Sequence, residues 1–104
     1  MLALDVRPRF IRELRRYKRL HGWSVEHDEL LDLAVDRLMA GESLPPLMRD
    51  HPLHSDYGGF RDFHLDGDLV CIYRLTIDCV LLHRIGRHTD LFRSRRGRTR
   101  SAGP

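Results

Sequence analysis

Hydrophobic residues recur at helical spacing in the first part of the chain and at alternate positions in the second. Between residues 8 and 21, Phe10, Leu14 and Tyr17 fall on one face, and the opposite face is strongly basic. Gly22 then suits the stop of a helix. The pattern predicts a first amphipathic helix over these residues.

A second helix is expected from Ser24, which can cap it, to about Ala40. Acidic residues near its start favour a helix, because they lie at the positive end of its dipole. Its apolar stripe consists of Leu31, Ala34, Val35, Leu38 and Met39. Because this helix is acidic and the first is basic, we expect a charge-complementary antiparallel hairpin. We interpret His21 and His27 as helix-surface residues.

Strand patterns dominate the rest of the chain. Three prolines forbid regular helix between residues 44 and 58, which is expected to be a loop. Asp66-Gly67 is a tight-turn signal between two strands. The candidate strands cover residues 2–6, 59–65, 69–75 and 79–85.

Together these elements predict an α+β domain with the order β-α-α-β-β-β. A two-helix hairpin packs on one face of an antiparallel sheet of about four strands, and the other face is free. A short helical turn is expected over residues 89–92. Residues 1–92 are predicted to form one domain, and residues 93–104 a basic, disordered tail.

The composition fits a small globular domain with a charged working surface. Hydrophobic residues make up 41% and charged residues 32% of the 104 positions, which suits one modest core. Seventeen of the 18 basic residues are arginine, a bias that fits phosphate recognition and genome composition equally well. The net charge of +3 is compatible with a polyanionic partner.

Nothing in the sequence indicates a membrane segment, a secretion signal or a zinc knuckle. No apolar run approaches the roughly 18 residues of a membrane span, and the N-terminus lacks a signal-peptide core. Cys71 and Cys79 lie in apolar runs without paired ligand spacing, so buried free thiols are expected. We therefore expect a soluble, cytoplasmic protein.

Histidines, arginines and carboxylates gather between Arg49 and Phe92. Histidine exchanges protons near neutrality, and the planar fork of arginine holds two phosphate oxygens. This combination predicts metal-free cleavage of RNA. Each histidine alone also has a structural interpretation: His51 can brace a loop, His64 lies at a strand end, and His88 can cap the last helical turn.

A series of motifs follows in one order between Leu44 and Phe92. They are Leu44-Pro45, Asp50-His51-Pro52-Leu53, Gly59-Phe60-Arg61-Asp62-Phe63-His64, Asp68, Ile72-Tyr73-Arg74-Leu75 and Arg84-Ile85-Gly86-Arg87-His88-Thr89-Asp90-Leu91-Phe92. In this order the chain resembles the YafQ branch of the RelE-like toxins. The resemblance implies a bacterial type II toxin that cleaves messenger RNA during translation in the A site of the 70S ribosome. It also implies a cognate antitoxin that holds the toxin inactive.

Carried over by position, the family's catalytic set falls on His51, His64, Asp68 and His88, with Phe92 as the aromatic residue that positions the substrate. Relatives can carry tryptophan directly after the aspartate, where this chain has Leu69. We expect four further RNA contacts: Arg49, Arg61, Arg84 and Arg87. Strand alternation, however, places Arg61 on the opposite face from His64. No cofactor, metal or membrane is expected.

The chemistry of this set follows from metal-free RNA cleavage. A base removes the proton of the ribose 2'-hydroxyl, and an acid protonates the leaving 5'-oxygen. Our hypothesis gives His88 the acid role with Asp68 orienting it. His64 or His51 is the base, and the other contacts phosphate. The expected products carry a 2',3'-cyclic phosphate or a 3'-phosphate, and a 5'-hydroxyl.

Two rival interpretations stay open at the level of sequence. The histidines and the aspartate of the catalytic set could instead form a metal cluster. Alternatively, the chain is a noncatalytic, degenerate toxin that grips RNA or the ribosome through its basic helix and tail.

Overall fold

The computed structural model describes residues 1–92, and the tail prediction for residues 93–104 lies outside them. The strands are β1 (Ala3–Val6), β2 (His51–Pro52), β3 (Arg61–His64), β4 (Leu69–Leu75) and β5 (Cys79–Arg87). The helices are α1 (Pro8–His21) and α2 (Val25–Met39), with 3-10 turns η1 (Pro46–Met48) and η2 (Ser55–Tyr57). Residues 88–92 form a helical turn, as expected. The α+β class and the order of the main elements are confirmed.

The sheet has five strands in the order β1-β5-β4-β3-β2. The strands β2 to β5 are antiparallel neighbours, as predicted for β3, β4 and β5. The edge strand β1 differs, because it pairs in parallel with β5, from Ala3 opposite Cys79 to Val6 opposite Leu82. Parallel pairing needs a long crossover connection, which α1, α2 and the following strands supply. Alternation within a strand carries no information on this pairing, so the sequence predicted a purely antiparallel sheet.

The second difference is β2, a two-residue strand inside the segment predicted to be a loop. His51 lies opposite Asp62 of β3, and Pro52 lies opposite Arg61. Proline disfavours a central strand because it lacks the N–H group, but an edge strand tolerates it. The edge pairing matters for function, because it brings His51 to the sheet.

Both helices begin and end where the local sequence predicts. Pro8 occupies the first turn of α1, and Gly22 follows its end at a φ of 78°, in the left-handed region that favours glycine. The Oγ of Ser24 accepts a hydrogen bond from the backbone N–H of His27 and so caps α2.

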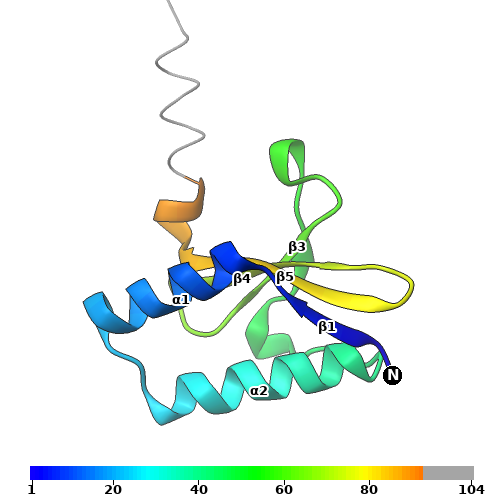
Figure 1. Cartoon of the computed structure of the whole chain (residues 1–104), viewed down its shortest axis with the longest axis horizontal. Coiled ribbons are helices and arrows are strands. Elements are labelled where there is room, and N and C mark those ends of the chain that lie inside the picture. The colour runs from blue at the N-terminus through cyan, green and yellow to red at the C-terminus, as the bar shows by residue number, and fades with distance from the viewer. Residues whose placement is uncertain (93–104) are drawn as a thin grey trace, which may run out of the picture.

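The main core lies between the helices and one face of the sheet. The helices contribute Phe10, Ala34 and Leu38. The strands contribute Phe63, Leu69, Cys71, Tyr73, Val80, Leu82 and Ile85. Figure 1 shows α2 running along one side of the sheet, with α1 and α2 joined at one end.

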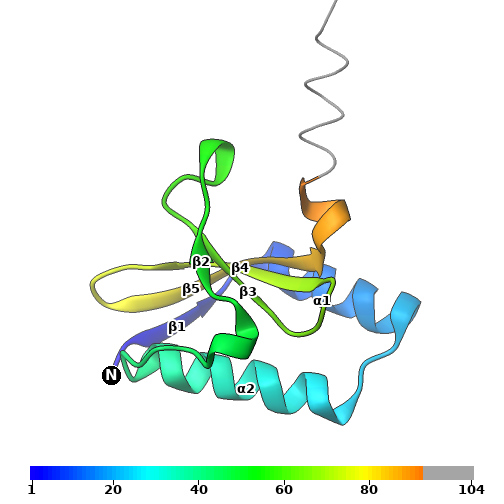
Figure 2. The ribbon, with the colours of Figure 1, turned by 180° about the vertical axis from the view of Figure 1, so that it is seen from behind.

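The opposite face of the sheet is partly covered rather than free. The loop that carries η2 and the C-terminal helical turn lie on the side away from α2 (Figures 1 and 2). They form a smaller cluster whose members are Val70, Ile72 and Leu91, with Leu53, Tyr57, Phe60 and Phe92 packed against it. This face therefore offers a rim of partly buried aromatic rings.

Ion pairs do not contribute to the expected charge complementarity between α1 and α2 within the described residues. The charged residues of the two helices are mostly exposed. Glu13 of α1 instead pairs with Arg84 of β5, between Oε2 and Nη2 at 2.6 Å. Among the described residues, neither helix has the length and apolarity required to cross a membrane.

Candidate active site

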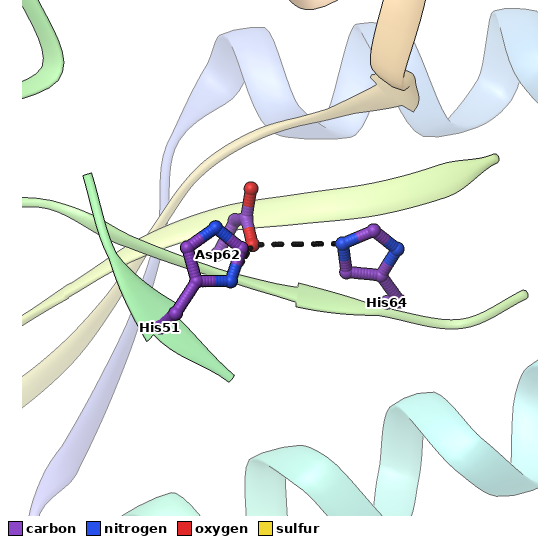
Figure 3. Close-up of side chains that lie close together, drawn as sticks. All are labelled: His51, Asp62 and His64. Carbon is purple, nitrogen blue, oxygen red and sulfur yellow. Dashed lines mark ion pairs between the residues drawn. The ribbon is translucent and has the colours of Figure 1, made fainter. Parts of the chain in front are cut away.

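The edge formed by β2 and β3 brings two histidines to one carboxylate. His51 lies directly opposite Asp62, and His64 lies two residues further along β3, so all three side chains share one face. Oδ1 of Asp62 is 3.2 Å from Nδ1 of His51 and 3.8 Å from Nε2 of His64. Figure 3 shows the carboxylate between the two rings.

Asp62 is an unusual residue for this position, because its side chain is fully buried. Neither carboxylate oxygen accepts a hydrogen bond from the described residues, and the contacts with the two imidazoles are ion pairs only when those rings are protonated. Burial raises the pKa of Asp62, and the nearby His51 and His64 oppose that shift. A carboxylate in this state attracts a proton, or a cation, into the space between the two rings.

Asp62 is not among the catalytic residues expected from sequence, although it lies inside one of the motifs. One signal was present, a spacing of two from His64. Such spacing places both side chains on one face of a strand. This signal does not reveal that the carboxylate is buried without hydrogen bonds, because that depends on how β2 and β4 flank it.

His51 has a defined tautomer. Its Nδ1 lies 2.8 Å from the backbone carbonyl oxygen of Arg49, which can only accept a hydrogen bond. Nδ1 therefore carries a proton, and in the neutral ring Nε2 carries the lone pair. The side chain is half exposed. Because Nδ1 lies beside the buried carboxylate and carries the hydrogen of the neutral ring, Nε2 is the nitrogen left to accept a proton.

His64 is more enclosed, with a side chain that is 12% exposed. Its Nδ1 lies 3.2 Å from Nη2 of Arg49 and therefore accepts a hydrogen bond from the guanidinium. Arg49 reaches this position from the end of η1, where its φ is 50°. Burial lowers the pKa of His64, and Asp62 opposes that shift while Arg49 reinforces it.

His88 continues the row of rings. Its centroid lies 6.5 Å from that of His64, with an interplanar angle of 27°, and 4.5 Å from the ring of Phe92. His51 and His64 are 6.2 Å apart. The structure therefore brings together three histidines of the predicted catalytic set and its aromatic residue.

Asp68 belongs to the site in a different way from the one expected. Its carboxylate Oδ2 accepts a hydrogen bond from Nε of Arg87 at 2.7 Å, and its backbone oxygen accepts one from the N–H of His88 at 2.7 Å. Asp68 therefore holds the backbone before the ring of His88, and its charge is paired with Arg87. The carboxylate does not contact the imidazole directly in the described structure.

Two of the arginines expected to contact RNA are engaged inside the fold. Arg61 donates from Nε to Asp50 at 3.1 Å, on the opposite face of β3 from His64. Arg84 donates to both carboxylate oxygens of Glu13, and its side chain is 13% exposed. Only the remaining two, Arg49 and Arg87, contact members of the catalytic set.

Leu69 occupies the position at which relatives can carry tryptophan, and its side chain points into the protein. The side chain is fully buried and belongs to the main core on the helix side of the sheet. His54 precedes η2, and the ring of His83 stacks on Phe60 at 4.5 Å. Within residues 1–92, no hydrogen bond, ion pair or ring contact links these three residues to His51, His64 or His88.

A metal ion finds potential ligands only in part of the predicted set. Within the described residues, His51, Asp62 and His64 offer one ligand atom each, and these atoms lie within 4.8 Å of one another. The cluster anticipated from sequence contained Asp68 and His88 instead of Asp62. Two imidazoles and a carboxylate suit a transition metal chemically.

The match to known proteins spans almost all of the described chain. Residues 2–93 match the family described as the bacterial toxin of type II toxin-antitoxin systems, YafQ. The mRNA interferase toxin YafQ of Escherichia coli strain B / BL21-DE3 is 43% identical over 49 residues, which make up 47% of this chain and 53% of that protein. The chain thus spans about half the length of the curated relatives it matches.

Solved structures of similar proteins agree with this fold. A copper-bound mutant toxin from Helicobacter pylori superposes with a TM-score of 0.79 at 29% identity, covering 88% of this chain and 100% of that one. A chain of the Escherichia coli DinJ-YafQ complex gives 0.74 at 27% identity, covering 88% and 99%. With the family model matched over residues 2–93, this chain belongs to the YafQ family of type II toxins.

Proposed function

We propose that the chain is an endoribonuclease that cleaves translated messenger RNA by metal-free acid and base catalysis. The observation that carries this proposal is the row of three imidazoles beside one buried carboxylate, with ring separations of 6.2 and 6.5 Å. Membership of the YafQ family and relatives named mRNA interferases support it. Such a site requires the ribose 2'-hydroxyl, so DNA is not a substrate.

Of the two histidines that the sequence left as candidates for the base, we assign this role to His51. The carbonyl of Arg49 fixes the proton on Nδ1, so Nε2 can accept the proton of the 2'-hydroxyl. The imidazolium that forms then lies 3.2 Å from the Asp62 carboxylate. A buried aspartate behind a histidine stabilises that charge in the same way as in hydrolytic triads.

The acid is His88, at the other end of the row. Contact with Phe92 at 4.5 Å fixes its ring from the side. In the protonated form it donates to the leaving 5'-oxygen. His64 lies between the two ends and, with Arg49, supplies hydrogen-bond donors to the phosphate as negative charge develops there. Arg87, which is half exposed, adds a second guanidinium that is held by Asp68.

Two partners follow from this function. The solved DinJ-YafQ complexes support a cognate antitoxin for this chain. The exposed basic residues of α1 suit ribosomal RNA, because each neutralised phosphate releases a counterion. The substrate is messenger RNA in the A site of the 70S ribosome, which places the toxin in the cytoplasm.

The test uses programmed ribosomes with purified toxin. His88→Ala is expected to abolish cleavage while the ribosome still binds the variant. Loss of cleavage without loss of binding separates an enzyme from the noncatalytic, degenerate toxin, which needs no acid. Wild-type cleavage by His88→Ala would contradict the proposal.

A metal-dependent nuclease is the second candidate, and a specific observation favours it. His51, Asp62 and His64 form a potential ligand set, and the Helicobacter pylori relative was solved with copper. Excess chelator discriminates between the two. Metal-free catalysis predicts full cleavage after chelation, whereas loss of cleavage that added metal restores would support the metal enzyme.

A further inference from the structure

His27 connects the helical hairpin to the catalytic half of the chain. It occupies the third position of α2, where its Nδ1 accepts a hydrogen bond from the backbone N–H of Ser24 at 3.1 Å. Its Nε2 lies 2.9 Å from Oδ2 of Asp66, which follows β3. His27 was expected on the helix surface, but its side chain is only 18% exposed.

The two bonds define the state of the ring. A backbone N–H can only donate, so Nδ1 is unprotonated, and the hydrogen of a neutral ring must be on Nε2. Nε2 therefore donates to the Asp66 carboxylate. The ring of Trp23 packs against His27 at 4.9 Å, and that of Tyr17 lies at 6.5 Å. His27 is thus a neutral, enclosed imidazole with both nitrogens engaged.

Asp66 passes this connection to the turn between β3 and β4. Its other oxygen, Oδ1, accepts hydrogen bonds from the backbone N–H groups of Asp68 and Leu69, both at 2.9 Å. One oxygen therefore fixes the path of the turn, while the second fixes the turn to α2. Without the bond to His27, the aspartate can still shape the turn, but the turn is no longer held against the helix.

The turn between β3 and β4 also holds His88, the proposed acid. Asp68 accepts hydrogen bonds from Arg87 and from the backbone N–H of His88, both at 2.7 Å. A continuous set of hydrogen bonds therefore runs from Ser24 through His27 and Asp66 to the backbone of His88. Each step is made by atoms whose donor and acceptor roles are fixed.

We propose that His27 is a positioning residue for RNA cleavage, which sets the place of Asp68 and His88 through its bond to Asp66. The inference rests on the proposed nuclease function. Loss of the bond would leave the chemistry intact but the acid less well placed. A misplacement of about 1 Å is sufficient to lower a rate by roughly a hundredfold.

The simpler interpretation is that His27 only caps α2, and one substitution separates the two. Glutamine at the third helical position forms the usual capping box with serine, so His27→Gln retains the cap. A single glutamine amide cannot reach Ser24 and Asp66 together. We expect a folded variant with a slightly lower melting temperature, because one hydrogen bond is lost, an unchanged KM for programmed ribosomes, and a kcat lower by about ten- to a hundredfold.

The matched control is His21→Gln, which makes the same change in the same hairpin. The ring of His21 packs against Tyr17, and this variant is expected to cleave at the wild-type rate. Asp66→Asn breaks the bond from the other side, because Oδ1 still accepts from the turn while the amide N–H faces the N–H of His27. His27→Gln combined with Asp66→Asn should lose no more activity than either alone.

Four results are decisive. Reduced kcat in His27→Gln with no added loss in the double variant supports the inference. Wild-type kcat in His27→Gln, or losses that multiply in the double variant, overturn it and leave the nuclease proposal standing, provided that His88→Ala is inactive. Wild-type cleavage by His88→Ala would overturn the proposed function and this inference with it.

Discussion

Replacing Asp62 separates stability from activity more clearly than any other change in the site. The side chain is fully buried, and neither of its carboxylate oxygens accepts a hydrogen bond from the described residues. Asp62→Asn keeps the shape of the side chain and removes its charge. An amide costs less to bury than an unpaired carboxylate, so the variant is expected to be more stable and less active than the wild-type chain.

The size of the gain follows from the surroundings of the carboxylate. A buried, unsatisfied polar group costs about 1–3 kcal/mol, and a charged group costs more. His51 at 3.2 Å and His64 at 3.8 Å offset this cost only when their rings are protonated. Because asparagine still buries two polar groups, we expect a net gain of about 1–2 kcal/mol. For a domain of this size the melting temperature then rises by about 4–16 °C.

The gain depends on pH with a defined sign. Burial raises the pKa of Asp62 above its usual value of 3.8, so the folded chain loses stability as the pH rises through the raised pKa. The loss begins near the usual value of 3.8 and is complete above the raised pKa, so we compare about pH 4 with about pH 8. Asp62→Asn should therefore stabilise the chain more at the higher pH.

The assay is urea unfolding at both pH values, followed by cleavage of translated messenger RNA. Asp32→Asn is the matched control, because Asp32 lies exposed on α2, and it should change stability by less than about 0.5 kcal/mol. Cleavage by Asp62→Asn should fall by on the order of tenfold or more, since the imidazolium of His51 loses its partner. A variant that is less stable than wild type at the higher pH would refute the reasoning, as would one that cleaves normally.

Three further predictions concern the scaffold and the site. Glu13→Gln leaves the charge of Arg84 largely buried with a weaker partner, so urea unfolding should show a loss of about 2–3 kcal/mol; an unchanged midpoint would mean that the pair is not structural. Leu69→Trp should lower stability by about 1–3 kcal/mol through overpacking and should not improve RNA binding, because the side chain lies in the main core; tighter binding would contradict that position. Burial lowers the pKa of His64 below 6.5, so the wild-type chain loses stability as the pH falls through 6.5. In melting experiments at several pH values, His64→Gln should lose less stability over the same range. Equal losses in the two proteins would argue against the lowered pKa.

Much of the fold could be predicted from local patterns. The apolar face of α1, the cap at Ser24 and the turn at Asp66-Gly67 each reflect interactions within a few residues. The parallel pairing of β1 with β5 and the edge strand β2 could not be predicted in this way, because both depend on segments far apart in the chain.

The candidate site, too, could be predicted only in part. The order of motifs identified His51, His64 and His88, and the structure brings them together. Charge alone did not distinguish Arg84, which is bound to Glu13, from Arg49, which contacts His64. Residue types show which groups can take part in chemistry, whereas only tertiary packing shows which of them already have a partner.

The roles of Asp62 and His27 could not be predicted from the sequence. Asp62 matters because it is buried without a hydrogen bond, and His27 because it meets a residue that follows it by 39 positions. Neither fact has a local signature. A histidine at the start of a helix is expected to lie on the surface unless the tertiary contact that it makes is known.

The most direct measurement is the chemistry of the RNA ends that the toxin produces on programmed ribosomes in the presence of chelator. Attack by the 2'-hydroxyl, with His51 as base and His88 as acid, predicts an upstream fragment that ends in a 2',3'-cyclic phosphate or a 3'-phosphate. The downstream fragment should begin with a 5'-hydroxyl. A 5'-phosphate on that fragment, or cleavage only after metal is restored, would contradict the mechanism.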